Sequence, residues 1–342
     1  MAHDQNIPAQ TGGFAPGTRQ AQLQHLFNRY ALLLAWAVTI IIFGIVEPDT
    51  FLQFDNFASM FNSQAVLVVL TYGLVVTLTA GEYDLSVASV LTLSAMIVAV
   101  LNAQYHFPIG IAILAAFAAG GLVGIINGLL VIKVRIDSII ATLGTGTLVG
   151  GAVLWISGSE TITGISQTLV EYVIVPKIFG LSLGFVYAVI LTFLLWYVLK
   201  YTPIGRQLLF VGRGRRISRL SGLNVDRLRF GSLVCGSLLG AFAGILYAGT
   251  SGAADPQSGV SFLLPAFAAS FLGSTAITPG RFNAWGSFAA VYFLMTGISG
   301  LSLMGIQVFI QDLFYGGALI IAVALSIMVR HSEASERDVA QD

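Results

Sequence analysis

The chain has 342 residues, of which 56% are hydrophobic and 9% are charged, and its formal net charge is zero. Because a soluble domain carries about 25% charged residues, this composition excludes a soluble globular protein. The composition predicts an all-α polytopic membrane protein, and its single cysteine, Cys235, excludes an intrachain disulfide.

Apolar segments long enough to cross a bilayer core of about 30 Å as helices recur along the sequence. We expect ten spans, near residues 30–47, 57–80, 85–103, 109–132, 138–157, 181–199, 230–250, 262–277, 284–302 and 307–329. The first is expected to be an uncleaved span, because acids and a proline follow it instead of a small-residue cleavage site. Residues 30–329 then form the membrane domain, between tails at 1–29 and 330–342.

The distribution of basic residues predicts the orientation of these spans, since cytoplasmic loops carry an excess of Lys and Arg. Eight of the sixteen basic residues lie between Lys200 and Arg229, with one acid, Asp226. With a cytoplasmic N-terminus, fifteen of the sixteen fall on the cytoplasmic side and only Lys177 falls outside. We therefore expect both termini, and the basic loop 200–229, in the cytoplasm.

Two predicted spans carry small residues at four-residue spacing. One series is Gly120, Gly124 and Gly128, and the other is Ser232, Gly236, Gly240, Gly244 and Ala248. Small residues let helix backbones approach closely in lipid. We expect both ridges to be buried helix crossings rather than ligand contacts.

The segment from Gly81 to Ser89 interrupts two apolar runs with two acids, Glu82 and Asp84. Ionisable residues at membrane depth are costly and by default suggest function. Asp84 is also placed to cap the helix that starts near Leu85, so capping and a pathway role are both open. For Glu82, a water-filled pathway or an interhelical pair stands against a solvated position near the cytoplasm.

Other polar side chains lie in the predicted spans near this segment: Ser86, Asn127, Thr142 and Thr145. Asn bonds between membrane helices and Thr bonds its own helix backbone, so a structural role is open for each of them. Together with Glu82 and Asp84, they are the candidate lining of a translocation pathway.

The sequence shows no catalytic constellation. Its four histidines, His3, His25, His106 and His331, lie scattered in tails and short loops. No lysine stands in a G-x-x-x-x-G-K-[ST] pattern, so the sequence lacks a phosphate-binding loop. We expect no enzymatic activity, no metal and no cofactor in this chain.

The basic loop has an internal pattern that a solvated, orientation-setting loop does not require. Thr202–Arg206 is predicted to be a turn, and Gly212–Gly214 to be a second break. Arg216–Leu220 is predicted to be a short helix that ends at Gly222.

Ile217 and Leu220, three residues apart in this helix, suit insertion into a groove on a partner protein. Binding of nucleic acid is not expected, because the neighbouring segments are membrane spans.

From about Asn56 to Val329, the sequence resembles the permease subunits of ribose-type bacterial ABC sugar importers. The matching stretches are Gly81…Asp84-Leu-Ser-Val…Ser89, Asn127-Gly128, Ile140-Ala-Thr-Leu-Gly-Thr145, Thr202-Pro-Ile-Gly-Arg206 and Arg219-Leu-Ser-Gly-Leu-Asn-Val225. In that family the Gly-Arg…Leu-Ser-Gly loop carries the coupling helix that docks on an ATPase subunit. The resemblance implies that Arg216–Leu223 do so here. The candidate coupling residues are Gly205, Arg206, Arg213, Arg216, Ile217, Ser218, Leu220, Ser221 and Gly222.

The resemblance also implies the partners and the task. A periplasmic binding protein would deliver a pentose, a hexose or a related polyol to loops near 158–180 and 251–262. A separate ATPase would power transport, and a second permease chain, identical or paralogous, would complete the pathway in the bacterial inner membrane. The alternative is a self-sufficient, ion-coupled secondary transporter that uses Glu82 and Asp84.

The sequence departs from the family pattern inside the membrane domain. The family usually has Gly-Gly where this chain has Gly81-Glu82, and a glycine where it has Ala88. Its usual Tyr-Glu-Leu reads Phe262-Leu-Leu264 here, and later glycine pairs are also changed. These departures bear on the substrate more than on the architecture.

Overall fold

The structure, a computed structural model, describes residues 19–175, 180–307 and 309–339. Its α-helices are α1 (Arg19–Val46), α2 (Pro48–Phe51), α3 (Phe54–Ser63), α4 (Ala65–Thr79), α5 (Val87–Ala99), α6 (Ile109–Leu129), α7 (Ser138–Ser157), α8 (Gln167–Ile174), α9 (Leu183–Tyr201), α10 (Pro203–Arg213), α11 (Arg215–Leu220), α12 (Val225–Ser251), α13 (Val260–Gly273), α14 (Ala284–Leu303) and α15 (Phe309–Val339). Two π-helical turns, η1 (Val100–Gln104) and η2 (Leu130–Val134), continue α5 and α6. The prediction of an all-α polytopic membrane protein is confirmed.

Each of the ten predicted spans lies on a helix. Seven helices in the described part of the chain are long and apolar enough to cross a membrane, and α3 with α4, bent by 42° where they meet, makes an eighth. The two remaining predicted spans, 262–277 and 307–329, correspond to shorter apolar helices, Val260–Gly273 and Phe309–Leu325. The helix at the predicted span 262–277 is α13, which has 14 residues and contains Pro265.

Several helices begin or end outside the predicted spans. α1 already begins at Arg19 and α15 continues to Val339, so helix extends into both predicted tails. The loop 200–229 is itself largely helical, since α10, α11 and the first turns of α12 lie in it. The spans were predicted from apolar runs, which show only the part of a helix that lies in the membrane. Arg, Gln and Leu also favour helix in water, so the helices continue beyond those runs. Lys177 lies outside the described residues.

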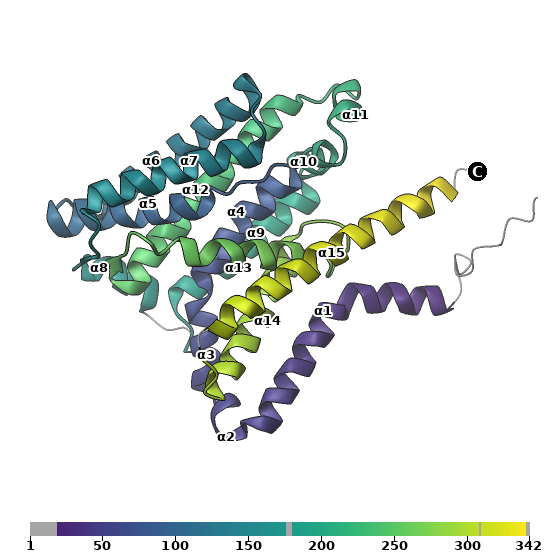
Figure 1. Cartoon of the computed structure of the whole chain (residues 1–342), viewed down its shortest axis with the longest axis horizontal. Helices are drawn as coiled ribbons and strands as arrows, with labels where there is room; N and C mark the ends of the chain where they lie inside the picture. The colour runs from purple at the N-terminus through teal and green to yellow at the C-terminus, as the bar shows by residue number, and fades with distance from the viewer. Residues whose placement is uncertain (1–18, 176–179, 308, 340–342) are drawn as a thin grey trace, which may run out of the picture.

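The helix α12 lies at the centre of the fold, packed against α4, α5 and α6. Figure 1 shows α5, α6, α7 and α12 running side by side, with α11 at one end of this group. We call this end, which carries residues 81–86, 131–138 and 200–229, the basic end.

The glycine ridge of α6 packs on α12. A Cβ atom on Gly120 would lie 2.6 Å from Cβ of Ala241, and one on Gly128 would lie 2.5 Å from the ring of Phe230. A Cβ on Gly124 would lie 2.8 Å from Cα of Val234. These distances leave no room for a side chain, so the predicted buried crossing is present.

The small-residue ridge of α12 faces other helices. A Cβ atom on Gly236 would lie 2.6 Å from Cγ2 of Thr77 in α4, and one on Gly240 would lie 2.9 Å from the carbonyl oxygen of Val87 in α5. Farther along, a Cβ on Gly244 would overlap the carbonyl oxygen of Leu91. The two ridges therefore do not pack on each other: α12 uses one face for α6 and another for α4 and α5.

A small polar assembly closes the end opposite the basic end. Strand β1 (Ile162–Thr163) pairs antiparallel with β2 (Ala253–Ala254). Beside them, the Thr161 hydroxyl donates to Asp255 Oδ2 at 2.7 Å. Helix α8 packs on the last turns of α12, where Val173 contacts Gly249.

Replacing Gly244 by Ala should destabilise the protein by about 1–3 kcal/mol, because the new methyl group forces α12 away from α5. Gly231→Ala is the matched control, since a Cβ atom on Gly231 meets no other atom within 4 Å. The control should be neutral or stabilising by about 0.5–1 kcal/mol, the helix-propensity difference between Gly and Ala. Thermal unfolding of both purified variants in detergent checks this, and equal melting temperatures would contradict the packing argument.

Candidate functional site

The break between α4 and α5 is the centre of the candidate site. Helix α4 ends at Thr79, and Gly81 takes φ +78°, a conformation that side-chain-bearing residues rarely adopt. The end of α10 lies directly against this turn, since a Cβ atom on Gly212 would overlap the carbonyl oxygen of Thr79. Segment 81–86 is therefore held against the basic loop.

Glu82 is fully buried and pairs with two arginines of that loop. Its Oε1 atom accepts from Nη2 of Arg215 at 2.8 Å and from Nε of Arg229. Arg215 opens α11 and also donates to the carbonyl oxygen of Gly81 at 3.1 Å, while Arg229 lies in the first turns of α12. Glu82 is thus an interhelical ion-pair partner and is not solvated.

Beyond Glu82, a chain of buried hydrogen bonds joins α5, α6 and α7. Asp84 Oδ1 accepts from the backbone N–H and the hydroxyl of Ser86, at 2.9 and 2.6 Å. Asn127 Nδ2 donates to Ser86 Oγ at 2.8 Å, and the Thr145 hydroxyl donates to Asn127 Oδ1 at 2.5 Å. All four side chains are buried, so the network is sealed inside the bundle.

The first turns of α7 bind the backbone of the broken segment. The Ser138 hydroxyl accepts from the N–H of Tyr83 at 3.2 Å. The Thr142 hydroxyl oxygen lies 3.2 Å from the carbonyl oxygen of Tyr83 and accepts from the N–H of Leu85 at 3.0 Å. These bonds supply partners for backbone groups that leave the helical hydrogen-bond ladder at the break.

The six predicted pathway residues therefore meet in one region. Five of them, Asp84, Ser86, Asn127, Thr142 and Thr145, bond to one another or to the segment between them, while Glu82 bonds toward the basic loop. Asp84 accepts the N–H just before α5, as a capping residue does. Its Oδ2 atom and Oε2 of Glu82 are buried and find no hydrogen-bond partner among the described residues.

Of the nine predicted coupling residues, seven are exposed and two are buried. Arg206, Arg213, Arg216, Ile217, Leu220, Ser221 and Gly222 are exposed, whereas Gly205 and Ser218 are buried. The Ser218 hydroxyl donates to the carbonyl oxygens of Phe210 and Gly214 and so fixes α11 on α10.

The predicted short helix is present as Arg215–Leu220, and Gly222, with φ +79°, follows its end. The predicted turn at Thr202–Arg206 is wrong, because this stretch begins α10. Thr202 caps that helix by accepting the N–H of Gly205 at 3.3 Å, and Pro203 occupies its first position.

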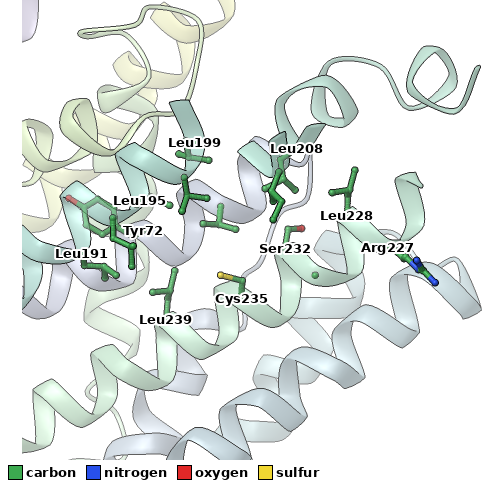
Figure 2. A pocket seen from close by; sticks show the side chains of 15 residues that line it. Tyr72, Leu191, Leu195, Leu199, Leu208, Arg227, Leu228, Ser232, Cys235 and Leu239 are labelled. Atoms are coloured by element: carbon green, nitrogen blue, oxygen red, sulfur yellow. The ribbon is translucent and has the colours of Figure 1, made fainter. Parts of the chain in front are cut away.

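Two cavities flank this region. A polar one of 510 Å³ at the basic end is lined by Glu82, Arg135, Asp137, Ser138, Arg215, Arg219, Asp226, Arg229 and three apolar residues of 131–136. An apolar one of 420 Å³ lies between α4, α9, α10 and α12, where Figure 2 shows leucines around it and Arg227 at its edge. A sugar needs several convergent polar partners, so the apolar cavity is not suited to hold one.

Comparison with known proteins decides the family. Residues 56–323 match the family model described as the branched-chain amino acid transport system / permease component. The chain belongs to this family. It is a permease component of a transport system and a multi-pass protein of the bacterial inner membrane.

Curated relatives cover nearly the whole chain. The D-allose transport system permease protein of Escherichia coli K12 is 26% identical over 89% of this chain and 93% of its own length. The ribose import permease protein of Haemophilus influenzae is 29% identical over 90% and 95%. The autoinducer 2 import system permease protein of Enterobacter sp. 638 is 31% identical over 88% of each. No solved structure matches this chain.

Sequence reasoning missed Arg215, Arg229 and Ser138 as members of the site. A buried acid requires a cation, and the basic loop offers eight basic residues as candidates. The sequence does not say which of them reaches Glu82, since Arg215 and Arg229 lie 133 and 147 residues away from it in the chain.

Thr145→Val should destabilise the protein by about 1–3 kcal/mol, because the buried amide oxygen of Asn127 loses its donor while the side-chain shape is kept. Thr147→Val is the control on the same helix, since Thr147 is exposed and bonds only its own turn, at Leu143. It should change stability by less than about 0.5 kcal/mol. Thermal unfolding measures both, and equal effects would contradict a cohesive role of the network.

Proposed function

We propose that this chain forms the translocation pathway of an ATP-driven importer for a sugar or a related polyol. The match of residues 56–323 to a permease family carries this conclusion, and it is supported by relatives named for ribose and D-allose. An ATPase and a substrate-binding protein act with a permease of this kind, and a second permease chain, identical or paralogous, completes the pathway.

The ATPase docks on α11. Ile217 and Leu220 are 63% and 81% exposed on this six-residue helix, and Arg216, just before Ile217, is exposed as well. Apolar side chains that stand free in a basic surface are suited to a groove on a partner protein. Ser218 and Arg215 hold the other side of the helix on the protein, so the exposed face is presented in a fixed position.

Solute passes beside the broken segment. Ser86, Asn127, Thr142 and Thr145 supply hydroxyl and amide groups of the kind that bind sugar hydroxyls. In the described state Ser86, Asn127 and Thr145 bind one another and Thr142 binds the backbone of the break, so passage requires that α7 and the break separate. ATP-driven movement of α11 shifts the population toward that open state.

The binding protein docks at the opposite end of the bundle. Thr161 and Thr163 beside the β1–β2 pair, and Gln167 and Glu171 of α8, expose polar side chains there. The described part of the first predicted docking loop, 158–175, meets the second, 251–262, in this assembly, as a docking surface for a second protein requires.

An ion-coupled secondary transporter is not supported. A coupling acid has to bind and release its ion, whereas Glu82 pairs with two arginines and Asp84 is buried and accepts two hydrogen bonds from Ser86. Uptake of radiolabelled ribose, D-allose and L-arabinose into proteoliposomes tests the choice. We expect uptake of at least one sugar that requires ATP, the ATPase and the binding protein. Uptake by this chain alone, driven by a proton or sodium gradient, would contradict the proposal.

The double variant Arg216→Ala, Leu220→Asp should reduce co-purification of the ATPase subunit at least tenfold. The interface between α11 and the ATPase loses the apolar side chain of Leu220 and gains a carboxylate in the groove of the ATPase. Membrane insertion should be unchanged, since both side chains are exposed. The control is Tyr105→Asp, which changes an exposed aromatic residue just after η1, at the end of the bundle away from α11. It should leave co-purification of the ATPase intact. Unchanged co-purification of the double variant would refute docking at α11.

A further inference from the structure

A buried carboxylate joins the candidate docking helix to the break in the membrane bundle, beside the bond of Arg215 to the carbonyl oxygen of Gly81. Glu82 Oε1 accepts from Arg215 on α11 and from Arg229 on α12, while the backbone of Glu82 belongs to segment 81–86. Arg215 is two residues from the exposed Ile217. Glu82 is two residues from Asp84, where the buried network begins. The ion-paired carboxylate of Glu82 therefore lies on a short path from the docking face to the network.

Burial makes this connection hard to break. The Glu82 side chain is fully buried; its partner on α12, Arg229, is 11% exposed, and its partner on α11, Arg215, is 48% exposed. Separating these charges around a buried carboxylate costs more than breaking an exposed pair. An exposed pair of the same loop, Arg219 with Asp226 at 2.9 Å, offers the contrast, because its side chains are 60% and 54% exposed.

The amides of the broken segment are held by groups that a movement would disturb. The N–H of Glu82 donates to the carbonyl oxygen of Thr77 at 3.0 Å. Those of Tyr83 and Leu85 donate to hydroxyls of α7, and that of Ser86 donates to Asp84. If α11 shifts while its ion pair stays intact, segment 81–86 is pulled with it and these bonds change.

We propose that Glu82 is a positioning residue that makes segment 81–86 follow the coupling helix α11, and so passes the ATPase's nucleotide state to the buried network. This inference rests on the proposed docking of the ATPase at α11. It assigns to Glu82 a role in transmission, in place of a role in binding solute or ions.

Hydrogen–deuterium exchange on the complete complex, with and without a non-hydrolysable ATP analogue, tests the proposal. In the wild type, exchange should change both at 215–220 and at 81–86 when the analogue binds. In Glu82→Gln and in Arg215→Gln, the change at 81–86 should fall at least fivefold while that at 215–220 stays within twofold. Arg215 is 48% exposed, so its variant carries the test even where Glu82→Gln folds poorly.

Asp226→Asn, which breaks the exposed pair of the same loop, is the matched control and should keep both changes. If the ion pair were purely structural, Arg215→Gln would have a lower melting temperature but would keep the nucleotide-dependent change in exchange at 81–86. That result overturns the proposal. A wild-type change at 215–220 without one at 81–86 overturns it as well. No wild-type change at 215–220 would instead refute the docking of the ATPase at α11, and with it this inference.

Discussion

Close approach of helix backbones around α12 is the constraint on which the rest of this structure depends. Lipid is as apolar as leucine, so membrane helices associate through tight packing and polar bonds rather than through the hydrophobic effect. Glycines on α6 meet one face of α12, and glycines of α12 meet α4 and α5 on another. This packing brings the end of α4 beside the start of α12, where Glu82 and Arg229 can bond.

The break at 80–86 costs backbone hydrogen bonds, and the polar residues around it compensate that cost. Ser138 and Thr142 bond the freed backbone, and Asp84 bonds the start of α5. The same residue types that suggest a solute pathway in the sequence are thus needed to keep the break folded. The structural role follows because a broken helix inside a membrane is tolerated only where other groups bond its freed backbone.

The bilayer constraint explains why the spans were predictable. A continuous apolar run of fixed length has few alternatives to a helix, so all ten predicted spans fall on helices. Local ambiguity explains the errors. Thr202-Pro203 fits a turn as well as a helix start, and only the structure shows Thr202 capping α10. The partners of Glu82 were beyond sequence reasoning, because tertiary packing selects two arginines out of the basic loop.

Two contacts of different character link the basic loop to the break. The contact of Gly212 with Thr79 is steric: it resists approach, but it does not resist separation. The ion pairs of Glu82 resist separation, because parting them exposes a buried charge. For the break to follow the basic loop both when the loop approaches and when it withdraws, both kinds of contact are needed. In the proposed coupling, the buried carboxylate of Glu82 is the group that moves the break together with α11.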